Sequence, residues 1–314
     1  ATQASYTNSR QRKRWEEQPM RRSYVPITAT PFAAGPKYLE IVPSNHWLRN
    51  YIRCFWGSEK PYWKNKASGP DLVIPDTCAD IIYYMDYTDN KVMAGFCGPN
   101  DRSFYANDPF GTGHLVSTFC IRFYAWGAYA FSEASLSDTI NGFFDVQSRF
   151  RWLDCQLQKR LFEMKTIQDT VRFAEQLFMK RILSVRQNQI IDDAVDALLF
   201  HRGTLSAAAL AKEAFVSSRQ LERVFREYTG ITPKKISNLV RYQYLWNDIV
   251  RNPGFQILDA VEKYNYTDQP HLMREFKRYH AMDVKQARRY ARLNVANIQD
   301  DGACNCYDLS KGGM

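Results

Sequence analysis

Residues 205–235, LSAAALAKEAFVSSRQLERVFREYTGITPKK, carry the strongest structural pattern in the chain. Ser217 or Ser218 precedes a run in which apolar residues recur at steps of three and four, at Leu221, Val224, Phe225 and Tyr228. This spacing places them on one face of a helix that begins at a serine N-cap and ends at Gly230. We therefore predict helices over 205–214 and 219–228, joined by a tight turn.

The opposite face of the second predicted helix is basic. It presents Arg219, Glu222, Arg223 and Arg226, again at steps of three and four. An arginine can bond guanine with two hydrogen bonds and a carboxylate can accept one from cytosine, so such a helix suits the major groove of DNA. A solvated charged face on an ordinary helix would show the same pattern, and one helix alone favours that interpretation.

A second copy of the pattern changes the balance. Residues 257–289, ILDAVEKYNYTDQPHLMREFKRYHAMDVKQARR, repeat it at an offset of 51 residues. The matched pairs are Phe215 and Tyr266, Leu221 and Leu272, Arg223 and Arg274, Phe225 and Phe276, Arg226 and Lys277, Tyr228 and Tyr279, and Ile231 and Met282. A repeat that matches apolar and basic positions together indicates two copies of one helical unit. We predict its helices over 259–264 and 270–280.

A long helix over 233–251 connects the two copies. Pro233 suits its first turn, and Asn252-Pro253-Gly254 ends it. About 18 residues at a rise of about 1.5 Å each give roughly 27 Å. Such a rod could hold two recognition helices about one turn of DNA apart, roughly 34 Å.

With these features, residues 190–292 resemble the DNA-binding domain of the AraC/XylS family of bacterial transcription regulators. The usual pattern, Ser-x-x-x-Leu-x-Arg-x-Phe-(Lys/Arg) followed by Gly-(hydrophobic)-(Ser/Thr)-Pro, is matched at Ser217, Leu221, Arg223, Phe225, Arg226, Gly230, Thr232 and Pro233. The second copy matches at Asp268, Gln269, Arg274, Phe276 and Lys277. Asn265 and Ala281 stand where the family usually has Gly, and Val284 where it usually has Pro. Asparagine tolerates a left-handed backbone, so Asn265 can serve.

The resemblance implies which residues contact DNA. Base contacts would come from Arg219, Glu222 and Arg223 in the first recognition helix, and from Pro270, His271 and Arg274 in the second. Phosphate contacts would come from helix N-termini and from Ser217, Arg226, Lys234, Lys235, Arg241, Gln269 and Lys277. It also implies a transcription activator that works with RNA polymerase, with a homodimer as an open option.

The rest of the chain divides by charge and texture. Residues 1–36 hold six Lys/Arg and two acids, and residues 188–292 hold 17 and 12, within a net charge of +9. We expect a basic N-terminal arm over 1–36, disordered or loosely packed, a nearly neutral domain over 37–187, the DNA-binding domain over 188–292, and a tail over 293–314. A basic domain beside a neutral one is typical of a polyanion binder attached to another module.

The neutral domain alternates short apolar runs with turn residues. We predict strands over 38–43, 52–58, 71–75, 80–86, 91–98 and 115–124, which at this spacing indicate an antiparallel barrel or sandwich. Two helices follow between about 150 and 185, and they would link the domains or pair subunits. The predicted fold class is therefore α+β, with a β-rich domain and following helices ahead of an all-α double helix-turn-helix domain.

Family members commonly use such a domain to bind a small effector or to dimerise, and 73–86, 96–101 and 117–131 resemble the N-terminal domains of some of them. Arg122 could clamp an acidic effector, with Trp126 or Tyr84 as an apolar wall. The alternative is that Arg122 forms a structural salt bridge with Asp76 or Asp80. A regulator controlled by a protein partner on this domain is a second alternative, and the sequence leaves both choices open.

Other functions find little support in the sequence. Seven scattered cysteines, an odd number, indicate reduced thiols and a cytoplasmic protein. They lack the clustered spacing of a zinc site, which argues against a cysteine-based regulator that repairs DNA methylphosphotriesters. Cys304 and Cys306 in the tail offer only two ligands. We expect no metal, cofactor, catalytic residue, secretory signal or membrane span, since nucleotide-binding, hydrolase and zinc-protease motifs and long apolar runs do not occur.

Overall fold

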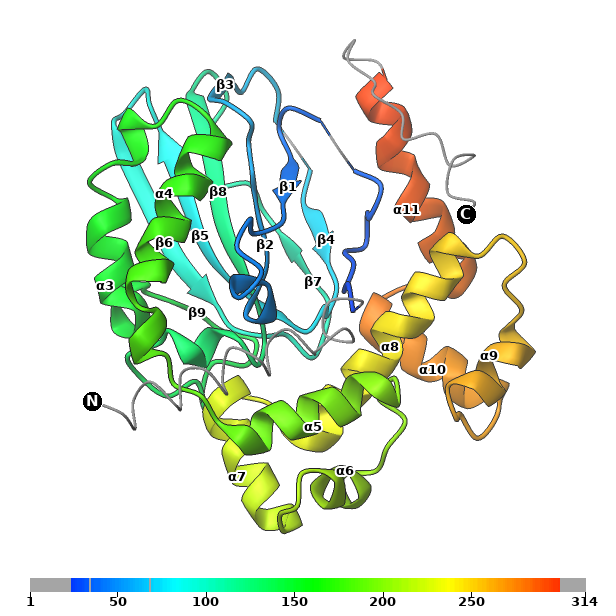
Figure 1. Ribbon diagram of the computed structural model, residues 1–314. Helices are drawn as coiled ribbons and strands as arrows, with labels where there is room; N and C mark the ends of the chain where they lie inside the picture. Colours follow the sequence, from blue (N-terminus) through cyan, green and yellow to red (C-terminus); the bar gives the residue numbers. More distant parts are fainter. Residues whose placement is uncertain (1–23, 34, 68, 300–314) are drawn as a thin grey trace, which may run out of the picture.

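The computed structural model describes residues 24–33, 35–67 and 69–299 of the chain. It has the expected α+β class, with a β-rich region and two helices followed by a helical region (Figure 1). The basic run of residues 10–14 and the pair Cys304 and Cys306 lie outside the described residues. Among the described helices, none combines the length and apolar character that crossing a bilayer requires.

The β-rich region consists of two antiparallel sheets. The larger sheet has the order β1 (Leu39–Ile41), β2 (Ile52–Gly57), β8 (Leu115–Tyr124), β5 (Cys78–Asp86), β6 (Lys91–Cys97) and β9 (Phe143–Phe144), and β3 (Tyr62–Trp63) also pairs with β8. The smaller sheet joins β4 (Asp71–Val73) to β7 (Phe104–Ala106). Over the described residues neither sheet closes on itself, so the architecture is open rather than a closed barrel.

Alternation along the long strands gives the larger sheet two different faces. One face buries apolar side chains, among them Tyr83, Phe119 and Phe123, beneath helices α3 (Gln147–Leu157) and α4 (Ile167–Lys180). The other face carries polar groups such as Asp80 and Arg122, which lie opposite each other in the register of β5 and β8. The six predicted strands are confirmed, whereas β3, β7 and β9 span only two or three residues and show no recognisable alternation.

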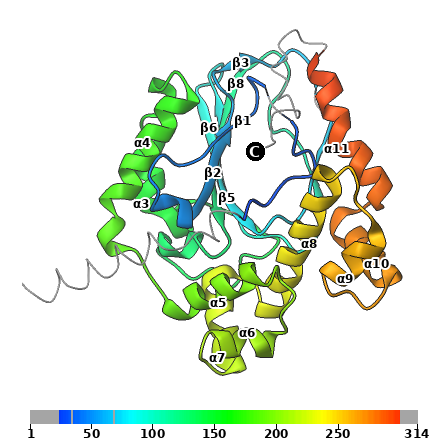
Figure 2. The ribbon, with the colours of Figure 1, turned by 45° about the vertical axis from the view of Figure 1, so that its right-hand side comes forward.

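The helical region confirms the predicted double motif. It contains α5 (Gln189–Phe200), α6 (Ala207–Glu213), α7 (Ser218–Thr229), α8 (Pro233–Arg251), α9 (Ile257–Lys263), α10 (Gln269–His280) and α11 (Val284–Gln299). Ser217 Oγ accepts a hydrogen bond from Gln220 N at the start of α7, and Gly230, with φ of 71°, ends that helix. Helix α8 runs from one motif to the other, with α6 and α7 beside one end and α9 and α10 beside the other (Figure 2).

The two copies differ by one residue in their turns. Helices α6 and α9 are related by an offset of 50 residues, whereas α7 and α10 are related by 51. The left-handed residues of the two turns are Phe215, with φ of 56°, and Asn265, with φ of 53°. The predicted pairing of Phe215 with Tyr266 is therefore wrong, and Tyr266 corresponds to Val216. Ala281, with φ of 61°, takes the left-handed position that Gly230 has in the first copy.

The N-terminal segment over residues 24–33 is packed, which corrects the expectation of a loose arm. Tyr24, Ile27 and Ala29 are buried in the same apolar cluster as the helices of the helical region. Helix α8 holds the segment, because Gln243 Oε1 accepts from Ile27 N at 2.8 Å and Trp246 Nε1 donates to Thr28 O at 2.9 Å. The core of the helical region therefore includes residues from far outside 188–292.

Candidate nucleic-acid interface

Helix α7 presents a basic face to solvent. Leu221, Val224 and Phe225 are buried on its inner side, whereas Arg219 and Arg223 are exposed on its outer side. Glu222 is exposed too, and its Oε1 accepts from Arg226 Nη2 at 2.9 Å. The predicted base-contacting residues of the first motif therefore share one accessible face. Glu222 and Arg226 already neutralise each other, so the pair would have to open for either to bind DNA alone.

Helix α10 offers a similar but partly covered face. Asp268 caps the helix, since its Oδ1 accepts from His271 N at 2.6 Å. Pro270, Gln269, Arg274 and Lys277 are exposed. The ring of His271 is half-buried and lies edge-on to Tyr266, with 5.3 Å between the ring centroids. The structure thus groups the predicted residues of the second motif but turns His271 partly inward.

Arg241, a predicted phosphate contact, is paired within the protein. Its Nη2 lies 2.8 Å from Glu275 Oε1 and 2.9 Å from Oε2, and the two side chains are only 12% and 11% exposed. The guanidinium also lies over the ring of Tyr266, 4.3 Å from its centroid. Because this charge is buried and paired, Arg241 links α8 to α10, and the pair would have to open before the guanidinium could contact a phosphate.

Lys235 lies at the boundary between the two regions. Its Nζ is 2.5 Å from Oδ2 of Asp101, which belongs to the loop after β6. Asn141 Nδ2 donates to the other carboxylate oxygen of Asp101 at 2.8 Å and fixes it in place. Lys234 is exposed next to it at the start of α8. Of the two predicted phosphate contacts here, Lys234 is accessible and Lys235 is held by the β-rich region.

Arg122 has the structural role that was the alternative to an effector clamp. Its Nε lies 2.9 Å from Asp80 Oδ1 and its Nη1 lies 3.1 Å from Asp76 Oδ2. Burial opposes the charge of Arg122, but the two carboxylates raise its pKa well above the usual value. Burial also opposes the charge of Asp76 and raises the pKa of its carboxyl group, although the nearby charge of Arg122 acts to lower it. The N–H groups of Arg122 that would bind an acidic ligand are therefore already paired with Asp76 and Asp80.

The two proposed wall residues lie in different surroundings. Trp126 is buried and stacks on Tyr124, with 5.1 Å between the centroids and 3° between the planes. It belongs to the cluster that includes Tyr24 and the DNA-binding helices, so it is part of the core. Tyr84 is half-buried and packs edge-on against Phe110. Trp126 therefore lies in the core and does not line a site for an effector beside Arg122.

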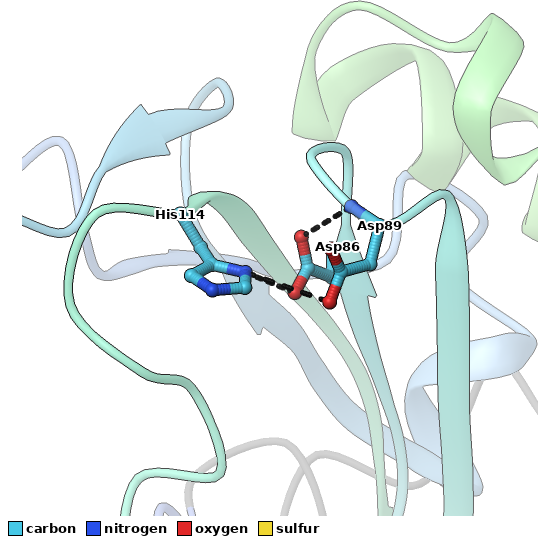
Figure 3. Close-up of side chains that lie close together, drawn as sticks. All are labelled: Asp86, Asp89 and His114. Atoms are coloured by element: carbon cyan, nitrogen blue, oxygen red, sulfur yellow. Dashed lines mark hydrogen bonds and ion pairs between the residues drawn. The ribbon is translucent and has the colours of Figure 1, made fainter.

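One cluster of potential metal ligands escaped the sequence reasoning. Asp86, Asp89 and His114 lie close together at the hairpin between β5 and β6, with His114 Nδ1 2.7 Å from Asp86 Oδ2 (Figure 3). Asp86 Oδ1 also accepts from the backbone N of Thr88 at 2.9 Å. Burial acts to raise the pKa of Asp86, but the N–H of Asp89, the imidazole of His114 and the N–H of Thr88 lower it on balance. These bonds make Asp86 the cap of the turn.

Comparison with known proteins agrees with this division of the chain. Residues 210–290 match a family described as a helix-turn-helix domain, and residues 39–145 match a domain of unknown function, DUF6597. No curated protein matches the chain. A solved AraC-type DNA-binding regulator from Chromobacterium violaceum is 21% identical, with a TM-score of 0.31, over 33% of this chain and 93% of its own. ToxT from Vibrio cholerae is 11% identical, with a TM-score of 0.38, over 75% of this chain and 98% of its own.

The assignment of the helical region rests on the repeated motif and on the family match over 210–290. Both copies have a helix, a turn and a second, capped helix with an exposed basic face, in the order expected from the sequence. A β-rich region precedes them, and its residues 39–145 match the domain of unknown function. Residues 210–290 therefore form a helix-turn-helix domain of the kind that their resemblance to the AraC/XylS family predicts.

Proposed function

We propose that the protein is a sequence-specific transcription activator that places α7 and α10 in two adjacent segments of the major groove. The observation that carries this proposal is the pair of exposed basic faces on two capped helices, one beside each end of α8. In it, Arg219, Arg223 and Arg274 contact bases. Lys234, Lys277 and the helix N-termini contact phosphates and set the orientation of the domain.

Selection of binding sites from random DNA tests this proposal. The full chain is the right sample, because a fragment that starts near residue 188 would lose the segment whose Ile27 and Thr28 bond α8. We expect one motif with two half-elements about ten base pairs apart. Binding that shows no sequence preference would contradict the proposal.

Two single variants separate base contacts from phosphate contacts. Arg223→Ala should cost about 1–3 kcal/mol at one base of the selected site and relax specificity there. Lys234→Ala should weaken cognate and random DNA alike and reduce the salt dependence of binding by about one ion. An equal loss on cognate and random DNA for Arg223→Ala would remove that arginine from the base contacts.

We further propose that the β-rich domain controls DNA binding. The first candidate for the controlling ligand is a small effector bound to this domain. The support is the contact of this domain with α7 and α8, through Tyr129 Oη on Glu227 at 2.7 Å and Asp101 on Lys235. A partner protein on this domain is the second candidate, favoured by the exposed Trp63 and Tyr105 on β3 and β7. Replacing Trp63 with Ser should leave an effector response intact and abolish a response to a partner bound there.

A further inference from the structure

An open polar hollow of about 250 Å³ lies where the β-rich domain passes into the helical region. Its wall comes from residues 130–133 and from residues 181–186, which connect α4 to α5. The charged groups of this wall are Arg181, Arg186 and Glu133. We call this site the arginine hollow.

Aromatic rings fix both guanidinium groups of the arginine hollow. Arg181 Cζ lies 4.5 Å from the ring centroid of Trp152, and Arg186 Cζ lies 5.0 Å from that of Tyr129. Trp152 is itself held, because its Nε1 donates to Phe131 O at 3.0 Å. Arg186 also hydrogen-bonds the side chain of Tyr129, and an arginine, with five N–H donors, keeps further N–H groups for a ligand. The two side chains are therefore positioned in advance of binding.

Carboxylates satisfy these arginines only weakly. Arg181 Nη2 is 3.7 Å from Glu133 Oε1, which is too long for a hydrogen bond. Arg186 Nη2 donates to the backbone oxygen of Glu133 at 3.3 Å, and within the described part of the chain no carboxylate lies within 4.0 Å of this arginine. Arg122, in contrast, has two carboxylates at about 3 Å. The wall of the hollow thus carries two positive charges against one negative charge, with a net charge of +1.

We propose that the arginine hollow binds a small oxyanion, the carboxylate or phosphate group of a metabolite, between Arg181 and Arg186. Guanidinium groups bind such anions through paired, charge-assisted hydrogen bonds. The ligand would tie the connection between α4 and α5 to the loop after Ala130. Tyr129, on which Arg186 lies, also bonds Glu227 of α7, so the site adjoins the first recognition helix. This ligand site deepens the proposed control by a small effector, and DNA recognition does not depend on it.

Binding of simple anions to the full chain without DNA tests the proposal. Inorganic phosphate and acetate would be titrated separately at fixed ionic strength, with chloride as the reference, by calorimetry and by the shift in melting temperature. Arg181→Gln and Arg186→Gln should each weaken binding by about tenfold, the loss of a charge-assisted hydrogen bond. Glu133→Gln should strengthen it severalfold, because the competing carboxylate becomes neutral. This gain cannot result from misfolding.

Arg160→Gln is the matched control. Arg160 also lies over an aromatic ring, 4.9 Å from the centroid of Phe173, but it has a carboxylate partner, Glu163, at 3.1 Å and does not line the hollow. The Arg160→Gln variant should bind phosphate or acetate as tightly as the unchanged protein does. A response to phosphate alone or to acetate alone supports the proposal and identifies the group. Equal binding in Arg181→Gln, or no binding of either anion, would overturn it. If neither anion binds and Glu133→Gln strengthens DNA binding, the two arginines contact the DNA backbone instead.

Discussion

Phe215 has a backbone conformation that is poorly suited to its side chain. It lies in the turn between α6 and α7 with φ of 56°, and its side chain is 89% exposed. A left-handed backbone costs an ordinary residue about 1–2 kcal/mol, and here no burial offsets that cost. Phe215→Gly should therefore raise the free energy of unfolding by about 1 kcal/mol, measured by urea denaturation. Phe200→Gly, at an exposed site within α5, should lower it; a loss in both variants would contradict the strain.

His280 makes stability depend on pH. It is buried between Trp246 and Phe276, its Nδ1 is 2.8 Å from Tyr242 Oη, and desolvation by burial lowers its pKa to about 3. The unfolded chain binds this proton near pH 6.5, and the folded chain does not. Below pH 6.5 the unfolded state is thus favoured by about 1.4 kcal/mol per pH unit, until the pH nears the folded pKa.

The comparison of two proteins at two pH values isolates this effect. His280→Asn keeps an acceptor for Tyr242 but has no titrating group. Urea denaturation at pH 7.0 and 5.5 should show that the unchanged protein loses about 1.4 kcal/mol more than the variant over this range. Identical losses in the two proteins would mean that His280 is protonated in the folded state.

Pairs of elements, more than single helices, position the second recognition helix. The Arg241–Glu275 pair joins α8 to α10, and both side chains are nearly buried. Glu275→Ala leaves Arg241 charged without a partner and should cost about 3 kcal/mol of stability. Helix α7 contributes no residue to this pair. The variant should therefore lose specificity in the half of the DNA site that α10 contacts, and keep it in the half that α7 contacts. Site selection with the variant measures both, and an even loss would show that the two motifs move as one body.

The Arg241–Glu275 pair also shows which features the sequence could predict and which it could not. Period, caps and repeat predicted the helices from α6 to α10 closely, since these signals are local. The partner of Arg241 is 34 residues away, and a family resemblance implied phosphate contact where the fold forms an ion pair. Tyr24 was likewise placed in a loose arm, because its partner Thr77 is 53 residues away. Long-range pairing decided the outcome at Arg122 as well, where strand register places Asp80 opposite it.

On the scale of the whole molecule, the β-rich domain pairs with a lysine that the sequence predicts to contact a phosphate. Lys235 is paired with Asp101, so it must leave that carboxylate before it can contact a phosphate. Asp101→Asn keeps a side chain beside Asn141 but removes the charge that competes with DNA. We expect affinity for cognate and random DNA to rise together, by about threefold, because an ion pair that is open to solvent on its lysine side contributes about 1 kcal/mol and phosphate contacts carry no sequence information.

A second background makes this prediction specific to the pair. In Lys235→Gln, the further change Asp101→Asn should give no gain in affinity measured by fluorescence anisotropy at several salt concentrations. The gain in the single variant should shrink as salt rises, since screening weakens both the ion pair and the phosphate contact. A gain that persists in Lys235→Gln would mean that Asp101 repels DNA directly. The two regions would then communicate through α7 and Tyr129, and Lys235 would have no part in it.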